Sequence, residues 1–201
     1  VTLATAATTY ALKSTGVEIL RVDNNIAGTS TVSVADAVGI TEVEVDLGVN
    51  TTAVTQNVSG LTGSETVTLK AYDSTTAGHT LAAVLADATG TADSIKFKVG
   101  AGTFVNTTAA KLKTDDIETV TIDSDNAQTL DLSLLAMTAA ADRMAVVVTG
   151  DTALTASATG ADITTINASG MKTGGSFVQS ARSATDAVTY TGSAGADTFI
   201  M

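Results

Sequence analysis

Three seven-residue segments of the chain follow one template. They are Val17–Asp23, Ile40–Asp46 and Ile117–Asp123. Each has apolar residues at its first, fourth and sixth positions and an Asp at its seventh. Because successive side chains of a strand point to opposite faces, the fourth and sixth positions lie on one buried face. The template therefore predicts a strand that ends at its acid.

The spacing of these segments predicts how the strands are arranged. The interval from Ile40 to Ile117 is close to three times the interval from Val17 to Ile40, so the third segment lies three further steps along the chain. Such a period is typical of a solenoid in which each repeat forms one coil. We therefore predict an all-β fold, a parallel β-solenoid (β-helix) with irregular coils. The residues expected inside are Val43, Val45, Val120 and Ile122, and those expected outside are Glu42, Glu44, Thr119 and Thr121.

Other segments support or interrupt this pattern. Met144–Thr149 is apolar on both faces and is expected to be covered on both sides. His79–Asp87 and Leu134–Asp142 carry helix-forming residues at helical spacing, which predicts short helices or irregular excursions between coils. Residues 1–14 fit either a strand or a short helix over residues 6–13. Further strands are expected at Thr31–Val34, Thr52–Val58, Glu65–Ala71, Ser94–Val99 and Thr129–Leu134.

Composition excludes several classes of protein. The 201 residues include 17 Gly, no Pro and only 3% aromatic residues, a mixture that suits short strands and tight turns. With 21 acids against 10 bases the net charge is −11, so nucleic acid is not an expected partner. The absence of Cys excludes disulfides and Cys-based sites. No apolar run is long enough to cross a bilayer, so membrane insertion is not expected. Separately, the chain is expected to be a fragment of a longer protein.

His79 is the one histidine of the chain. Without Cys or a second His it cannot form a His-based zinc site or a Cys-His nucleophile pair. No Gly-x-Ser-x-Gly segment provides the setting for a Ser-His-acid triad. We therefore interpret His79 as a surface or core-packing residue.

Acids follow several of the predicted strands. Asp123 and Asp125 begin like a calcium-binding loop, but Gln128 stands where that loop needs Gly, and Leu134 where it needs its closing Glu. One interpretation is that these are isolated acids that end strands. The other is that stacked coils bring acids into columns that need a cation, for which calcium is suited because it takes oxygen ligands from flexible turns. The candidate ligands at these strand ends are Asp23, Asp46, Asp123 and Asp125.

The end of the sequence carries the most specific motif. Gly192–Ile200 resembles one nonapeptide of the Gly-Gly-x-Gly-x-Asp-x-apolar-x repeat of the RTX β-roll, with Ser193 in place of the second Gly. In that fold the Gly-rich turn and its Asp bind calcium. The resemblance therefore implies Gly192, Gly195 and Asp197 as calcium ligands.

The preceding segments extend this resemblance. Thr149–Asp151, Ala161–Met171 and Lys172–Gly175 are similar to the strand repeats that lead into the RTX region of S-layer proteins and large type I-secreted surface proteins of Gram-negative bacteria. Membership of that family implies a parallel β-solenoid, calcium dependence and secretion to the cell surface through an uncleaved C-terminal signal. On this basis residues 1–16 are a leading segment, 17–190 the β-solenoid repeat domain and 191–201 the start of an RTX-like repeat.

Two classes of function remain. The first is a structural, non-enzymatic cell-surface protein, the building unit of a calcium-dependent extracellular lattice (S-layer) that self-associates with neighbouring copies and contacts cell-surface polysaccharide. The alternatives are a large secreted adhesin or the β-solenoid domain of a type I-secreted polysaccharide-acting enzyme. Arg21, Arg143 and Arg182 are scattered, Trp is absent and Tyr numbers three, so the residues that such enzymes use to hold sugars are sparse. The sequence favours the structural class.

Overall fold

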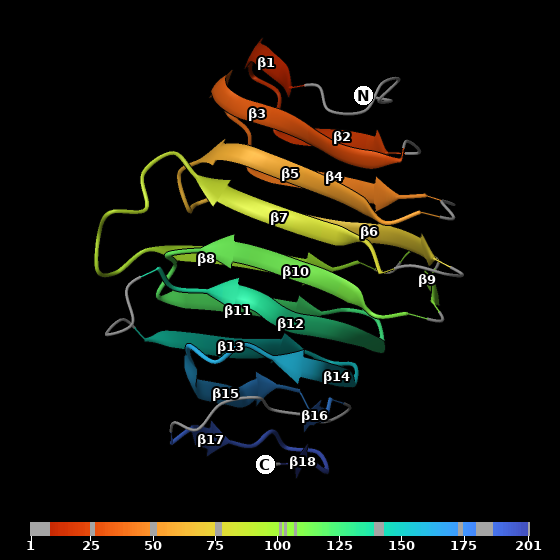
Figure 1. Cartoon of the computed structure of the whole chain (residues 1–201), viewed down its shortest axis with the longest axis vertical. Coiled ribbons are helices and arrows are strands. Elements are labelled where there is room, and N and C mark those ends of the chain that lie inside the picture. The colour runs from red at the N-terminus through yellow and green to blue at the C-terminus, as the bar shows by residue number, and fades with distance from the viewer. Residues whose placement is uncertain are drawn as a thin grey trace.

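The structure of the protein is a computed structural model in which every described element is a β-strand. The described residues form two nine-stranded sheets, and strands of each sheet pair in parallel (Figure 1). No described segment is a helix that would be long and apolar enough to cross a membrane. The described residues are 9–24, 27–48, 52–74, 78–100, 102, 104–106, 108–138, 143–172, 175–179 and 187–200.

Apart from the short β9, which follows β8 within one sheet, the chain passes alternately from one sheet to the other, so each coil adds one strand to each. Coils differ in length, because Met144 pairs with Ile163 across a short coil whereas Tyr72 pairs with Phe104 across a long one. Sheet A consists of β2 (Ile19–Asn24), β4 (Glu42–Leu47), β6 (Thr66–Ser74), β8 (Ser94–Val99), β11 (Thr119–Ser124), β13 (Met144–Gly150), β15 (Ile163–Met171), β17 (Thr189–Thr191) and the short β9 (Phe104–Asn106) beside β6. Sheet B consists of β1 (Thr9–Thr15), β3 (Gly28–Val38), β5 (Val54–Leu61), β7 (Thr80–Leu85), β10 (Ala110–Asp115), β12 (Gln128–Ala136), β14 (Leu154–Thr159), β16 (Phe177–Gln179) and β18 (Thr198–Phe199).

This arrangement confirms the predicted parallel β-solenoid. The three template segments supply β2, β4 and β11, all in sheet A. β2 pairs directly with β4, and β6 and β8 lie between β4 and β11, so the interval from Ile40 to Ile117 is three coil steps. Figure 1 shows the strands of each sheet following one another in chain order, from β1 and β2 at one end of the stack to β17 and β18 at the other, with β9 beside β6.

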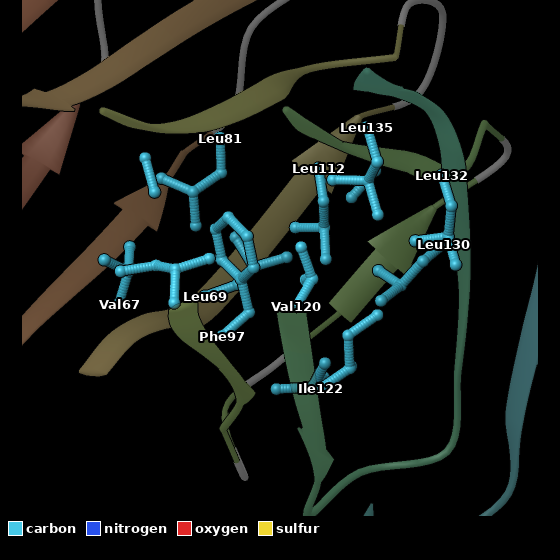
Figure 2. Close-up of a cluster of buried hydrophobic side chains, with 14 of the residues drawn as sticks. Val67, Leu69, Leu81, Phe97, Leu112, Val120, Ile122, Leu130, Leu132 and Leu135 are labelled. Carbon is cyan, nitrogen blue, oxygen red and sulfur yellow. The ribbon is translucent and has the colours of Figure 1, made fainter. Parts of the chain in front are cut away.

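The core lies between the two sheets and is built from inward-facing aliphatic side chains. Val43, Val45, Val120 and Ile122 are fully buried, as predicted. Phe97 and Val120 of sheet A and Leu112 and Leu130 of sheet B belong to one buried cluster (Figure 2). Each fully buried aliphatic side chain contributes about 1.5–3 kcal/mol relative to an exposed one. Glu42, Glu44, Thr119 and Thr121 are half-exposed on the outer face of sheet A.

The bounds of the template strands differ from the prediction. The strands begin at the third template position, and the first position, represented by Val17, lies in the turn before the strand. Gly16, Gly39 and Asp116 precede that position with φ of 71°, 100° and 58°, so the chain reverses there through a conformation that favours Gly or Asp. The template Asp is also not the end of the strand, because β2, β4 and β11 each continue one residue beyond it.

The expectation of short helices or irregular excursions is wrong over most of the part that the structure describes, because residues 80–85 form β7 and residues 134–136 belong to β12. Residues 139–142 of the second segment lie outside the described residues. Residues 80–85 form a strand despite their helix-forming residues because β5 and β10 pair with them on either side. Residues 9–15 adopt the strand alternative as β1, and residues 1–8 are not described.

The expectation that Met144–Thr149 is covered on both faces is also wrong. Within β13 the residues alternate between buried and half-exposed, so Ala145 and Val147 lie on an outer face that no layer of the described residues covers. A continuous apolar run therefore indicates a strand here without indicating that both of its faces are buried.

Candidate functional site

The outer face of sheet A brings together most of the acids that the sequence suggested as ligands. Asp23 and Asp46 are paired across β2 and β4 and form the one predicted column of acids that the register produces. They line a depression of about 290 Å³ together with Arg21, Glu44 and Lys70. Burial and the neighbouring charge of Asp23 raise the pKa of Asp46, while Lys70 acts in the opposite direction.

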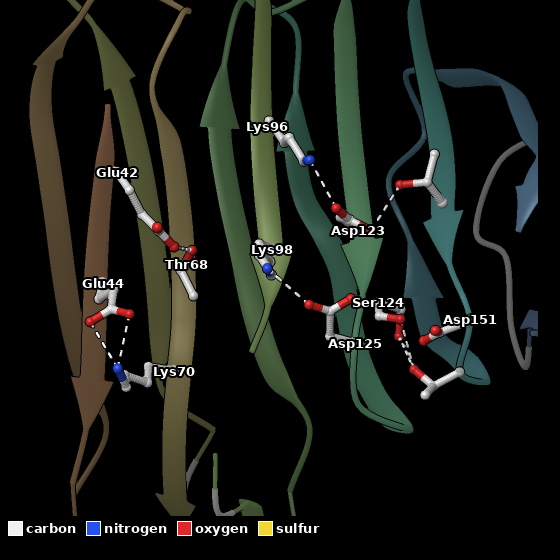
Figure 3. A network of polar contacts seen from close by, with 12 residues as sticks. Glu42, Glu44, Thr68, Lys70, Lys96, Lys98, Asp123, Ser124, Asp125 and Asp151 are labelled. Atoms are coloured by element: carbon white, nitrogen blue, oxygen red, sulfur yellow. Dashed lines mark hydrogen bonds and ion pairs between the residues drawn. The ribbon is translucent and has the colours of Figure 1, made fainter. Parts of the chain in front are cut away.

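Glu44 joins two cations from the strands on either side of it. Arg21 of β2 and Lys70 of β6 both form ion pairs with its carboxylate, and Lys70 Nζ lies 2.9 Å from each carboxylate oxygen (Figure 3). Burial raises the pKa of Glu44, but the hydrogen bonds from Lys70 and Arg21 outweigh it, so the pKa lies below its ordinary value. Glu44 is therefore a negative charge shared by three successive coils.

Asp123 and Asp125, two of the candidate calcium ligands, are bound by lysines of β8. Lys96 Nζ lies 2.8 Å from Asp123 Oδ2, and Lys98 Nζ lies 2.9 Å from Asp125 Oδ2 (Figure 3). Thr149 Oγ1 donates a 3.2 Å hydrogen bond to Asp123 Oδ1. Burial raises the pKa of Asp123, but these contacts outweigh it and the pKa lies below its ordinary value. The lysines therefore place positive charge beside two of the candidate calcium ligands.

Asp46 and Asp123 do not share a column, although both close the template. Glu44 pairs with Thr68, Thr68 with Lys98, and Lys98 with Asp123. Glu44, the fifth residue of its template copy, therefore lies in the same column as Asp123, the seventh residue of another copy. A shift of two residues keeps inward residues inward, so the core pattern does not reveal it.

The C-terminal turn uses its Asp for hydrogen bonds within the protein. Asp197 accepts from Ser193 N at 2.7 Å, Ser193 Oγ at 2.8 Å and Phe177 N at 2.8 Å. Burial raises the pKa of Asp197, but these donors outweigh it and the pKa lies below its ordinary value. Gly195 N donates to Ser193 Oγ at 3.0 Å, and a Cβ at Gly192 would lie 2.6 Å from Asp197 Oδ2. Ser193 thus closes the turn with donors directed at the carboxylate.

Three acids that were not among the candidate calcium ligands, Glu65, Glu118 and Asp162, have a role that the sequence analysis missed. Glu65 accepts hydrogen bonds from Thr62 N and Oγ1, Glu118 from Asp93 N, and Asp162 from Met137 N. These carboxylates satisfy backbone amides that the turns leave without a partner. The Thr62-x-x-Glu65 spacing, which has the form of a capping box, was the available sequence signal.

His79 lies in the core. Its side chain is fully buried, and its Nδ1 accepts a 3.1 Å hydrogen bond from Val54 N. Its ring meets that of Tyr72 edge to face, with centroids 5.3 Å apart, and its backbone N donates to Tyr72 Oη at 3.2 Å. This environment supports the interpretation of His79 as a core-packing residue.

The described part of the chain does not provide a complete metal cage. No three His, Asp or Glu side chains within it lie close enough together to hold an ion. Calcium takes six to eight oxygen ligands, whereas Asp23 and Asp46 supply only two carboxylates. Water or another molecule would have to provide the rest. No protein-family model, curated protein or solved structure matched the chain.

Proposed function

We propose that the chain is a structural, non-enzymatic unit of an extracellular surface lattice of the S-layer type. The observation that carries this proposal is the pair of parallel sheets that share one core and run the length of the described chain. A solenoid of this kind is stabilised by contacts between neighbouring coils, so its length grows without a second core. These properties suit a stiff spacer or tile at a cell surface.

Cross-coil ion pairs support a mechanical role. Arg21, Glu44 and Lys70 connect β2, β4 and β6, while Lys96 and Asp123 connect β8 and β11. These pairs run along the solenoid axis, so pulling the coils apart has to break them as well as backbone hydrogen bonds. Each partly exposed pair adds up to about 1 kcal/mol.

Calcium dependence is part of the proposal. The Asp23 and Asp46 carboxylates lie side by side, and repulsion between them raises the pKa of Asp46 in addition to burial. A divalent ion bound there, with water and a neighbouring copy supplying further oxygens, relieves that repulsion and reduces the effect of the net charge of −11.

The test is a set of melting curves in chelator, calcium and magnesium, with light scattering to follow association. An ion present at a hundredfold excess over its dissociation constant stabilises the folded state by about 2.7 kcal/mol. Calcium should act more strongly than magnesium, which loses its water reluctantly and requires octahedral geometry. Asp46→Asn should remove the calcium shift, and Asp131→Asn on sheet B is the matched control. Equal shifts with both ions would indicate general screening, and no association under any condition would contradict the lattice role.

One observation favours the adhesin alternative. A depression of about 390 Å³ is lined by the uncharged residues Phe104, Ala127, Gln128, Thr129, Ala153 and Thr155. An aromatic ring beside amides and hydroxyls suits a neutral saccharide, because the ring packs on apolar sugar faces and the polar groups hydrogen bond to hydroxyls. Titration calorimetry with dextran should detect binding that Phe104→Ala abolishes, whereas no heat with the unmodified chain would reject this alternative.

A further inference from the structure

His79 connects several strands in the interior of the solenoid. It directly precedes β7, which lies between β5 and β10 in sheet B. Its Nδ1 accepts the hydrogen bond from Val54 N at the start of β5, and its backbone O accepts a 2.8 Å hydrogen bond from Lys111 N of β10. Its ring contacts that of Tyr72 in β6, which belongs to sheet A. One residue therefore links three successive coils of sheet B to the facing sheet.

The hydrogen bond at Nδ1 defines the protonation state of the ring. A backbone N–H donates to Nδ1 only when that nitrogen carries no proton, so the ring of His79 is neutral, with its hydrogen on Nε2. A second proton has to enter at Nδ1, where it breaks the bond to Val54 N and leaves two donors facing each other. It also places a charge on a side chain that is 0% exposed. The folded chain therefore favours the neutral ring.

The ionisable side chains beside His79 in the described part of the chain do not favour its protonation. β5 and β7 contain no ionisable residue. From β6 the facing group is Tyr72, whose hydroxyl donates to Thr108 O at 2.9 Å and accepts from His79 N. From β10 it is Lys111, whose Nζ lies 4.0 Å from Asp131 Oδ2. A tyrosine is neutral below about pH 10 and a lysine is positively charged, so neither attracts a proton to the ring.

We propose that His79 is a pH-sensitive joint that opens the solenoid in mild acid. In an unfolded chain a histidine takes up a proton below about pH 6.5. In the folded chain the proton enters only if the bond to Val54 N is lost, so the opened state binds more protons and stability falls as pH falls. The start of β7 separates from β5 first, because the broken bond lies there. This property is additional to the proposed structural role, which requires no response to pH.

Urea unfolding in chelator over the range from about pH 7.5 to 5 tests the joint. The ratio of folded to unfolded chain should fall by up to about tenfold for each pH unit below about 6.5. His79→Asn offers an amide oxygen in place of Nδ1 but has no ionisable ring, so it should be less stable throughout and lack this decline. Tyr72→Phe is the matched control, because it removes a hydroxyl from the same cluster and should keep the decline. Equal pH dependence of the unmodified chain and His79→Asn would overturn the proposal.

Proton NMR of the unmodified chain is a second measurement that serves if His79→Asn does not fold. His79 is the one histidine of the chain, so a single imidazole reports the protonation. At about pH 6 the folded chain should keep the chemical shift of a neutral ring, while the chain in urea should show the shift of a largely protonated one. A ring that titrates alike in both states would overturn the proposal.

Hydrogen exchange locates the opening. After correction for the pH dependence of the intrinsic exchange rate, amides at the start of β7 should lose protection between about pH 7 and 5.5, whereas amides of β13 should change less. β13 is a suitable reference because it contains no ionisable residue and lies in the other sheet. Equal changes in β7 and β13 would contradict a local joint at His79.

Discussion

Gly150 and Gly16 both adopt positive φ, at 108° and 71°, but their surroundings differ. A Cβ at Gly150 would lie 2.3 Å from Ser124 O of the preceding coil, whereas a Cβ at Gly16 would have no atom within 4 Å. Gly16→Ala should cost about 1–2 kcal/mol through backbone conformation alone. Gly150→Ala should cost at least about 2 kcal/mol more because the coils must separate. Urea unfolding of both variants measures the difference, and equal losses would contradict the close coil contact.

Val120 and Thr121 are neighbours in β11 that point to opposite faces. Val120→Asp puts an unpaired charge into the core and should cost about 3 kcal/mol or more. Thr121→Asp should cost well under about 1 kcal/mol, because its side chain is half-exposed and Lys96 is its cross-strand neighbour. Thermal melting at equal protein concentration compares the two variants. Similar losses for both would mean that the face assignment is wrong.

At the scale of the element, two of the three outward carboxylates of β4, those of Glu44 and Asp46, have charges with opposite effects. The pKa of Glu44 lies below its ordinary value, so its charge stabilises the fold at neutral pH, and this contribution is lost as pH falls through that pKa. The pKa of Asp46 lies above its ordinary value, so its charge destabilises the fold at neutral pH, and that effect disappears on protonation.

Matched amide substitutions should reveal this contrast. In chelator at about pH 7, Glu44→Gln should lower stability by about 0.5–1 kcal/mol, and Asp46→Asn should raise it by a smaller amount. Both differences from the unmodified chain should shrink at about pH 3, where a larger fraction of the carboxyl groups is protonated. Denaturant unfolding at the two pH values measures the effects. Changes of the same sign at neutral pH would contradict the assigned environments.

At the scale of the whole molecule, the stability of a strand should depend on its distance from the ends. Each coil contacts its neighbours, so terminal coils have contacts on one side only, in line with the partial burial of β1, β17 and β18. Amides of β8, β11 and β13 should exchange with solvent most slowly, and those of the terminal strands fastest. Hydrogen-exchange mass spectrometry under monomeric conditions measures this gradient. Uniform protection would indicate one cooperative unit instead of a coil-by-coil stack.

The sequence by itself determined the fold class, the inward residues and the three-step interval between Ile40 and Ile117. It did so because alternation within a strand and recurrence of the template depend on local spacing alone. Only the tertiary structure decided which outward-facing residues lie beside one another on neighbouring strands of sheet A. A two-residue shift places Asp123 beside Lys98 and in the row of Glu44, while Asp46 pairs with Asp23. Such a shift leaves the core unchanged, so no hydrophobic pattern records it.

The same reason explains the errors in the alanine-rich segments and at the strand ends. Residues 80–85 have helical propensity in isolation, but β5 and β10 on either side bind them as β7. The sequence left open whether these acids end strands singly or share a cation, because it does not reveal which donors lie beside them. In the folded chain, lysines of β8 and backbone amides of the turns fill that role. Those partners come from other coils, a full repeat away in sequence, and only coil stacking brings them together.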